Sequence, residues 1–516
     1  MNHENASGRA SALGLAEWLR RRVVRAPQRP ALTCDNVTWT YGELWQRVEQ
    51  LSAVLAAHGV GRGDRVGHLD FDGPMFFVSQ FAVARLGAVF VPLNFRLSAP
   101  ELAFIINDAG LQLLLAGPSH QGMIDSVRAN LACRHYLGLQ ADAPGWPAVV
   151  PRMGQVAAVP PQVAVDPEEV AALMYTSGTT GHPKGAMLTH QNIWSQCLNV
   201  VLSKDMVSTD VALGFVPLFH VGGMLAVTLP TLVAGGHVVL QRGFDAGAVL
   251  QAIRHYRVTI AFAVPAMLLF MSQHADFAGA ELASLRLLSV GGGPMPVPLL
   301  QIYEERGIPV QQGYGLTETS ATVTFLAAER AADKPGSCGT PGMMTEICLQ
   351  DFSGQVIAAA GVKGEVCVRS SNVMKGYWNN ADASAAAFDQ QGWFHTGDVG
   401  YCDDEGFLYL SDRLKDVVIT GGENVYPAEV ESVLYAHPAI AECAVVGAPD
   451  DKWGERVVAI AVLKPGAALT LEELRRFAEG SLARYKLPRE LHLVTVLPRN
   501  AAGKLLKSRL REQIKA

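Results

Sequence analysis

The chain has 516 residues, of which 49% are hydrophobic and 17% are charged, and this composition excludes a disordered protein. The formal net charge is −6, so the chain has no overall positive field to attract nucleic acid or an acidic membrane. A length of 516 residues exceeds that of one ordinary core and predicts two or three domains.

Three further features bear on where the protein resides. The eight cysteines are scattered without a CxxC pair, and residues 1–24 contain no apolar signal core. In a large chain this pattern favours reduced thiols and a cytoplasmic protein. Residues 211–241 contain no Asp, Glu, Lys or Arg, but their prolines and glycines would break a spanning helix. We therefore expect no transmembrane segment.

Short apolar runs alternate with helical patterns through most of the chain. Residues 64–71 predict a strand, 75–88 a helix and 89–94 the next strand, and 258–265 and 285–296 each predict a strand that runs into a loop. This alternation indicates an α/β fold with a largely parallel sheet. In such sheets ligands bind at the carboxyl ends of the strands.

The pattern changes in the last third of the chain. Shorter strand-like pieces separated by Gly-rich turns predict a more antiparallel β subdomain at about 335–412. The pattern then restarts as a compact α+β unit of an ordinary domain size. We expect a large N-terminal domain at 1–412, a hinge at 413–416 and a small, mobile C-terminal domain at 417–516.

The segment YTSGTTGHPKGA, residues 175–186, follows a buried-strand pattern and holds three glycines, four Ser or Thr hydroxyls and one lysine. It does not match the P-loop pattern GxxxxGK[ST]. Glycine amides, hydroxyls and a lysine nevertheless suit phosphate oxygens. On residue types alone, a phosphate-binding loop and a mobile surface loop both stay open.

Four later motifs carry further candidates. Tyr314 in QQGYGLTET can stack on a base, and Glu318 in the same motif is a candidate ligand for a hard cation. Asp398 in the TGD turn can accept hydrogen bonds from a ribose, and Arg413 in DRLKD can reach a ribose or phosphate oxygen. Lys504 follows a glycine near the C-terminus. Each has an ordinary alternative, such as a packed ring, a turn cap or a surface lysine.

Together and in this order, these motifs resemble the adenylate-forming superfamily of acyl-CoA synthetases, aryl-CoA ligases, luciferases and peptide-synthetase adenylation domains. The resemblance covers essentially the full length. It is closest to bacterial fatty-acyl-CoA synthetases, through YTSGTTGHPKG, DRLKD with GGENVYPAE, and ARYKLP. It implies an ATP-dependent acid–thiol ligase whose small-molecule partners are a carboxylic acid, ATP with Mg²⁺, and coenzyme A. It implies no nucleic-acid partner.

The resemblance also assigns roles to residues. Lys504 would bridge the attacking carboxylate and the α-phosphate, Glu318 would bind Mg²⁺ together with Thr176, and Lys415 would act as the hinge. Gly421 and Gly422 would line the tunnel used in the thioester step. The nucleotide would be held by Thr176, Ser177, Gly178, Thr179, Thr180, Lys184, Gly291, Gly292, Gly293, Pro294, Gly313, Tyr314, Gly315, Thr317, Asp398 and Arg413.

The acyl pocket is where the resemblance is least specific. His220 would gate the pocket, although a buried core histidine is the alternative, and small side chains would leave room for the acyl group. We expect a medium- to long-chain fatty acid, with a hydroxycinnamate or benzoate-type acid, or transfer to a carrier protein, as alternatives. The pocket would be lined by His220, Val221, Gly222, Gly223 and Ala263.

Three questions stay open: the type of reaction, the role of the N-terminal helix and the oligomeric state. A luciferase-type oxygenase shares the adenylation step, whereas a nucleotide sensor is expected to lack Lys504 or Glu318, and both are present. The apolar face formed by Leu15, Trp18, Leu19 and Val23 either touches a membrane to collect lipid acids or packs on its own domain. The oligomeric state is open, with a homodimer as one alternative.

Overall fold

The computed structural model describes residues 14–176, 183–293, 295–351, 353–421, 423–450, 452–499 and 505–515. Contacts within the chain divide it into two compact units. The large unit comprises Met1–Ile347 and Val368–Phe394, and the small unit comprises Cys348–Cys367 and His395–Ala516. This division places residues 395–412 in the small unit, and the hinge at 413–416 stays a prediction.

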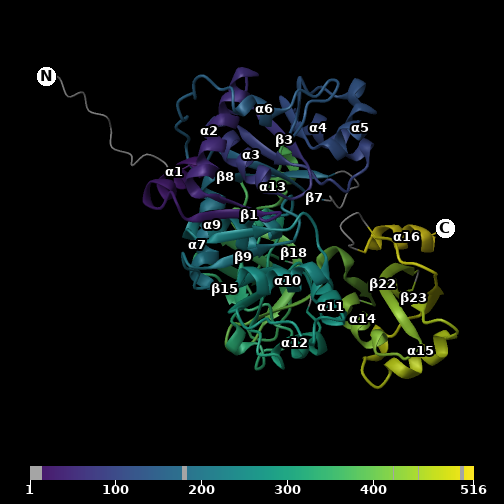
Figure 1. Ribbon diagram of the computed structural model, residues 1–516. Coiled ribbons are helices and arrows are strands. Elements are labelled where there is room, and N and C mark those ends of the chain that lie inside the picture. The colour runs from purple at the N-terminus through teal and green to yellow at the C-terminus, as the bar shows by residue number, and fades with distance from the viewer. Residues whose placement is uncertain are drawn as a thin grey trace. The chain divides into compact units, whose positions relative to one another are not determined.

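Two sheets form the centre of the large unit (Figure 1). The six-stranded sheet has the order β6-β5-β3-β4-β7-β8, and the nine-stranded sheet has the order β15-β14-β13-β12-β11-β9-β10-β1-β2. Their strands are β1 Pro30–Cys34, β2 Val37–Thr40, β3 Arg65–Leu69, β4 Val89–Pro92, β5 Leu113–Ala116, β6 His135–Gly138, β7 Val170–Thr176, β8 Lys184–Thr189, β9 Val211–Gly214, β10 His237–Leu240, β11 Ile260–Ala263, β12 Leu287–Val290, β13 Val310–Tyr314, β14 Thr324–Leu326 and β15 Thr340–Pro341.

Neighbouring strands are parallel in the interior of both sheets, and antiparallel pairs occur only toward the edges, at β1–β2, β7–β8, β13–β14 and β14–β15. The interior strands are short, buried apolar runs, which is typical of parallel sheets covered on both faces. The prediction of a largely parallel α/β fold is therefore confirmed, with strands at β3, β4, β11 and β12 where the apolar runs predicted them.

Helices connect these strands, and several begin with capping boxes that satisfy the first free amides, as at Thr40 and Ser98. The helices are α1 Leu15–Arg25, α2 Tyr41–Ala57, α3 Pro74–Arg85, α4 Ala99–Ala109, α5 Pro118–Asp125, α6 Val149–Met153, α7 His190–Ser203, α8 Val221–Gly223, α9 Leu229–Ala234, α10 Ala246–Tyr256, α11 Pro265–Gln273, α12 Val297–Glu304 and α13 Ala381–Ala386. The single-turn helices are η1 Arg128–Asn130, η3 Thr317–Thr319 and η4 Ala328–Arg330, with a π-helix η2 at Met224–Thr228.

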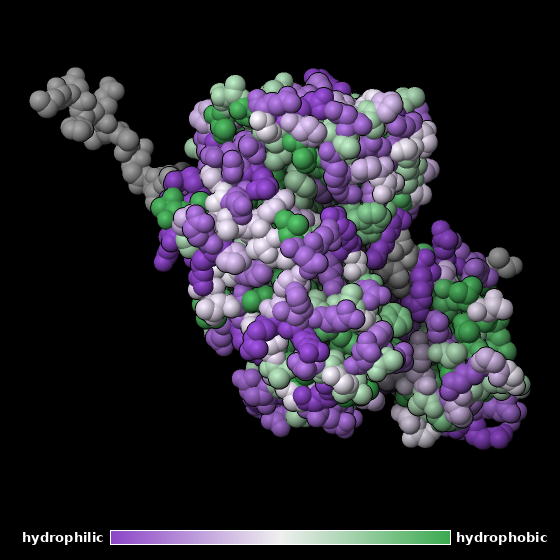
Figure 2. Space-filling view, in the orientation of Figure 1, coloured by the Kyte–Doolittle hydropathy of each residue, from purple (hydrophilic) through white to green (hydrophobic). Residues whose placement is uncertain are grey.

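The sequence left open whether the apolar face of α1 contacts a membrane or packs on its own domain. Leu15, Trp18 and Leu19 on α1 are at most 7% exposed, so these side chains pack within the large unit and are not presented to a membrane. Val23, the fourth residue of this face, is half-buried. No helix among the described residues is long and apolar enough to cross a bilayer. Figure 2 shows hydrophilic residues interspersed with small hydrophobic areas over the visible face of the large unit.

A four-stranded sheet, in the order β16-β17-β18-β19, forms the predicted β subdomain. Its strands are β16 Thr345–Gln350, β17 Gly364–Ser370, β18 Phe394–Cys402 and β19 Leu408–Arg413. This sheet has residues in both units. The elements that lie wholly in the small unit after β19 are η5 Leu414–Asp416, β20 Val418–Thr420, β21 Glu423–Val425, α14 Pro427–Tyr435, β22 Ile440–Asp450, β23 Gly454–Leu463, α15 Leu471–Ala478, η6 Arg484–Lys486, β24 Glu490–Leu493 and α16 Lys507–Lys515.

The small unit has a core on each face of its β22–β23 pair, because alternate side chains of these long strands point to opposite faces. Val445 and Val457 pack with α14 and α15 on one face, and Ala444 and Val458 pack with Leu510 of α16 on the other. Figure 1 shows α16 and α15 on different sides of these strands. This α+β unit matches the architecture predicted for the end of the chain.

Candidate active site

The predicted phosphate-binding segment is flanked by two paired strands. Thr176 ends β7 and lies opposite Lys184, which begins β8, so both residues lie at the carboxyl end of β7. The Thr176 hydroxyl lies 3.5 Å from the Lys184 carbonyl oxygen, to which it donates a long hydrogen bond. The predicted phosphate ligands Ser177, Gly178, Thr179 and Thr180 lie outside the described residues.

Tyr377 joins Lys184 of this hairpin to Glu318, the predicted Mg²⁺ ligand. The Tyr377 hydroxyl donates to Glu318 Oε1 at 2.9 Å, and Lys184 Nζ lies 5.1 Å from the centre of the Tyr377 ring. Burial and the nearby Glu318 carboxylate raise the pKa of Tyr377, so the phenol stays a hydrogen-bond donor. Lys184 also lines a cavity together with Asp108 and Trp378. The motif reasoning missed Tyr377, which lies outside every motif that the sequence singled out.

The backbone around Tyr314 has no room for side chains on its neighbours. A Cβ atom on Gly315 would lie 1.5 Å from the Ala321 carbonyl oxygen, and one on Gly313 would lie 2.8 Å from Thr322 Cγ2. Tyr314 itself is 8% exposed. The two glycines are therefore required by the fold, in addition to any contact with a nucleotide.

The glycine run after β12 lies against the same strand. A Cβ on Gly291 would lie 3.2 Å from the Gly313 carbonyl oxygen, and Gly292 has a φ of +79°, which disfavours any residue with a Cβ. The structure thus brings together two of the predicted adenine-side segments. Thr317 begins η3, directly before Glu318, and Pro294 lies outside the described residues.

The predicted acyl pocket centres on the turn from His220 into α8. The His220 ring lies 4.4 Å from the ring of Phe219, and its backbone carbonyl accepts from the Met224 amide. A Cβ on Gly223 would lie 2.2 Å from the Pro217 carbonyl oxygen, so this glycine is required by backbone packing. Val221 beside it is half-buried.

The sequence placed the segment around Ala263 in the pocket without singling out its neighbour Phe262. A Cβ on Gly222 would lie 2.9 Å from Phe262 Cε1, and one on Gly291 would lie 3.3 Å from Phe262 Cε2. One aromatic ring therefore lies between the predicted pocket wall and the predicted adenine-side loop, whereas Ala263 is fully buried. The alternation of strand β11 is the signal that could have identified Phe262.

Two buried charged groups support the elements that carry these candidates. The Asp72 carboxylate accepts from the Leu218 amide at 2.9 Å, close to His220 in the chain, and burial raises the pKa of Asp72 to about 7. Lys204 Nζ donates to the Ala226 carbonyl oxygen at 3.0 Å and to Ser289 Oγ at 2.7 Å. Ala226 belongs to the π-helix η2, and Ser289 lies on β12.

Within the small unit, the two predicted ribose ligands are paired. Asp398 and Arg413 are opposite each other on β18 and β19, with Arg413 Nε 2.6 Å from Asp398 Oδ1. Asp398 is 6% exposed, whereas the Arg413 side chain is 42% exposed and accessible to a ligand. Lys415 lies two residues further in η5, and burial lowers its pKa.

The predicted tunnel and catalytic lysine are described only in part. Gly421 has a φ of +61°, and its amide donates to the Trp453 carbonyl oxygen at 2.7 Å. A Cβ on Gly421 would lie 2.8 Å from the Trp453 ring. Gly422 and Lys504 lie outside the described residues, so their roles stay predictions.

Two family models match the chain. The model described as AMP-binding enzyme matches residues 19–378, and the model described as AMP-binding enzyme C-terminal domain matches residues 429–504. The two matches include Lys184, Glu318 and Lys504 and leave residues 379–428, with Asp398 and Arg413, unmatched.

Relatives with assigned activities match over almost the full length. Feruloyl-CoA synthase of Amycolatopsis is 41% identical over 97% of this chain and 99% of its own length. A long-chain-fatty-acid–CoA ligase of Mycobacterium tuberculosis is 39% identical over 96% of this chain and 98% of its own.

Solved structures of related enzymes also match this chain over almost its full length. Those of the o-succinylbenzoate CoA synthetase of Bacillus subtilis include complexes with its acyl-adenylate intermediate (37% identity, TM-score 0.85) and with ATP and magnesium ion (35% identity, TM-score 0.84). Both match 97% of this chain and at least 98% of that enzyme.

Proposed function

This chain belongs to the family of AMP-binding enzymes, and we propose that it is an AMP-forming ligase that joins a carboxylic acid to coenzyme A. In the first step a carboxylate oxygen of the acid attacks the α-phosphorus of ATP and pyrophosphate leaves. In the second step the thiol of coenzyme A attacks the acyl carbonyl and AMP leaves. Neither step needs a nucleophile from the protein.

The arrangement of Lys184, Tyr377 and Glu318 supports this proposal best. It places a cation and a carboxylate on two sides of one phenol, next to the hairpin predicted to hold phosphates. Among the described residues, Tyr377 donates to Glu318 Oε1 and none donates to Oε2, so the carboxylate fits a hard-cation ligand. Glu318 would hold Mg²⁺, which when bound neutralises charge on the phosphate oxygens.

We assign roles to the remaining candidate residues from the place of each residue within its own unit. Lys184 would bind phosphate oxygens as a point charge, and Tyr377 would orient the Glu318 carboxylate. Arg413 and Asp398 would hold the ribose, since Arg413 offers its exposed guanidinium and Asp398 fixes its orientation. Lys504 would stabilise the charge that develops at the α-phosphate, which is commonly among the largest catalytic contributions.

For the acid we propose a medium- to long-chain fatty acid, because Gly222 of the predicted pocket wall and Gly291 of the predicted adenine-side loop, on the other side of Phe262, contribute only hydrogen atoms. An aromatic acid is the second candidate. The Phe262 ring between these glycines offers an edge or a face to a flat substrate, and a feruloyl-CoA synthase is among the relatives.

The test is a pyrophosphate-release assay with ATP, Mg²⁺ and coenzyme A over saturated fatty acids of graded length, ferulate and benzoate. The ligase proposal predicts AMP and an acyl-CoA of the expected mass with at least one acid. Formation of ADP, or of no acyl-CoA with any acid, would contradict it. Glu318→Gln should abolish the reaction, whereas Glu346→Gln, which alters an exposed carboxylate paired with Arg369, should not.

A further inference from the structure

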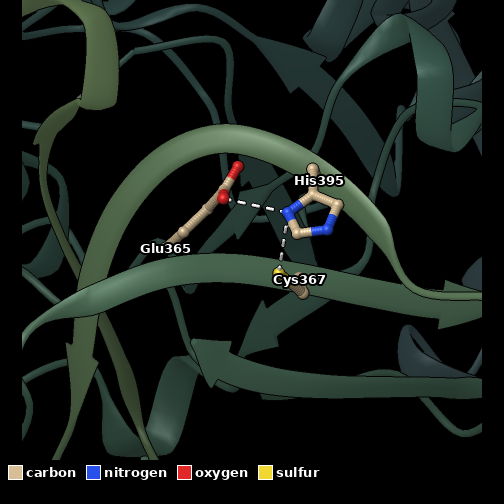
Figure 3. A group of neighbouring side chains, drawn as sticks. All are labelled: Glu365, Cys367 and His395. Atoms are coloured by element: carbon tan, nitrogen blue, oxygen red, sulfur yellow. Dashed lines mark hydrogen bonds and ion pairs between the residues drawn. The ribbon is translucent and has the colours of Figure 1, made fainter. Parts of the chain in front are cut away.

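Three side chains with metal-binding atoms meet on the β subdomain, apart from the residues used above. Glu365 and Cys367 are two positions apart on β17, so they point to the same face of the sheet. His395 extends from β18, the neighbouring strand, toward both of them (Figure 3). The three belong to the small unit, so their arrangement does not depend on how the two units are placed.

A single ring nitrogen lies between the other two groups. His395 Nδ1 is 2.9 Å from Glu365 Oε2 and 3.6 Å from Cys367 Sγ. All three ligand atoms lie within 4.8 Å of one another. Nδ1 holds at most one proton, so the two neighbouring groups compete for one hydrogen-bond position. A metal ion at the centre would contact all three atoms at once.

The two distances from His395 Nδ1 suit a tetrahedral ion. Zinc binds nitrogen and oxygen at about 2.0–2.2 Å and sulfur at about 2.3 Å, which places tetrahedral ligand atoms roughly 3.3–3.6 Å apart. The sulfur–nitrogen distance of 3.6 Å already matches. The nitrogen–oxygen distance of 2.9 Å needs to open by only a few tenths of an ångström.

The surroundings orient one ligand and leave another accessible. The Gly397 amide donates to Glu365 Oε1 at 2.9 Å, which fixes the carboxylate in the way that outer hydrogen bonds orient metal ligands. Cys367 is fully buried, whereas the side chains of His395 and Glu365 are 29% and 16% exposed. An ion can therefore enter from the side of His395, and a water molecule would complete its coordination.

We propose that Glu365, Cys367 and His395 form a binding site for a thiophilic divalent metal ion of the zinc class. A thiolate and an imidazole select such an ion over Mg²⁺, which prefers oxygen ligands. Binding displaces the thiol proton of Cys367, and any proton on His395 Nδ1, into solvent. The site is separate from the proposed Mg²⁺ ligand Glu318, and it stands whether or not the ligase proposal holds.

Hydrogen bonds also link the proposed metal site to Asp398, one of the two predicted ribose ligands in the small unit. Gly397, whose amide holds Glu365, directly precedes Asp398, and the Asp398 amide in turn donates to Thr396 Oγ1. A metal ion on Glu365 would therefore stiffen the turn that presents Asp398 to Arg413. A bound ion is expected to leave the ligand set of Glu318 unchanged.

The experiment uses the full chain, stripped of metal with a chelator and titrated with Co²⁺ in the absence of ATP and Mg²⁺. A thiolate ligand gives an intense near-ultraviolet charge-transfer absorption, so we expect this band to saturate at one Co²⁺ per chain and to disappear when Zn²⁺ is added. Cys367→Ser should abolish the band. Cys402→Ser, a change at a half-buried thiol on β18, should leave it intact.

A second variant covers the case in which Cys367→Ser does not fold. His395→Gln keeps the buried thiol and alters a partly exposed side chain, and it should weaken Zn²⁺ binding more than about 100-fold, because loss of an outer-shell partner alone costs about 10–100-fold. A competition titration with a chromophoric chelator measures this change. Absence of the band in the parent chain, a band that persists in Cys367→Ser, or unchanged Zn²⁺ affinity in His395→Gln would each overturn the proposal.

Discussion

Lys204 offers a quantitative test of the interior of the large unit. Its side chain is 3% exposed, and it donates to the carbonyl oxygen of Ala226 and to the hydroxyl of Ser289. Burial lowers the pKa of Lys204 to about 7, and no carboxylate in the described part of the chain offsets the loss of hydration. We predict that the stability of the protein relative to its Lys204→Met variant rises steeply between pH 7 and 9.

The magnitude follows from proton linkage. In the unfolded chain the lysine keeps its ordinary pKa of about 10.4, so between pH 7 and 10 the unfolded state binds more protons than the folded state. Stability therefore rises with pH in this window, by up to about 1.4 kcal/mol per pH unit. With a folded pKa near 7, the gain between pH 6 and 9 is about 2–3 kcal/mol.

The assay is equilibrium urea unfolding of both proteins at pH 6, 7, 8 and 9, followed by circular dichroism. The Met variant leaves Ala226 and Ser289 without a donor, at about 1–3 kcal/mol each, but this cost does not vary with pH and the comparison removes it. Lys375→Met, a change at an exposed lysine, should show no such rise. A difference independent of pH would show that Lys204 keeps its proton to pH 9 and would refute the reasoning.

Three further predictions concern the proposed reaction. Tyr377→Phe removes the 2.9 Å hydrogen bond to Glu318 and should raise the KM for Mg-ATP about tenfold, as expected for one bond to a charged group; an unchanged KM in steady-state assays would contradict the orienting role. Asp398→Asn breaks the ion pair with Arg413 and should weaken ATP binding at least about tenfold by isothermal titration, and equal affinity would argue against a ribose site. Lys415→Pro should slow thioester formation far more than ATP–pyrophosphate exchange, and an equal loss of both half-reactions would remove the hinge.

The periodicity and composition of the sequence were sufficient to predict the interior strands of the large unit. The runs at 64–71 and 89–94 are apolar because both faces of β3 and β4 are covered, so the pattern in the sequence reports the burial directly. The order of the motifs assigned Asp398 and Arg413 to one ribose site, which stays a prediction, and the register of β18 and β19 places the two residues opposite each other.

Contacts between distant segments could not be predicted in this way. Tyr377 lies 59 residues from Glu318, and no local pattern relates a phenol after one strand to a carboxylate in another loop. Lys204 lies in a polar stretch, SKD, that is typical of an exposed turn, and only the packing of η2 and β12 around it shows that it is buried. In both cases tertiary packing decides what local sequence leaves open.

The glycines of the large unit differ in which atoms a side chain would contact, and this difference determines which substitutions the fold can tolerate. At Gly315 a Cβ would collide with the backbone of Ala321, whereas at Gly222 it would meet only the edge of the Phe262 ring, a side chain that can rotate. Substitutions at Gly315 would be purged, but substitutions at Gly222 would survive and reshape the proposed acid pocket. Descendants of this chain could therefore come to accept new acids by point mutation, while the strand that carries Tyr314 stayed unchanged.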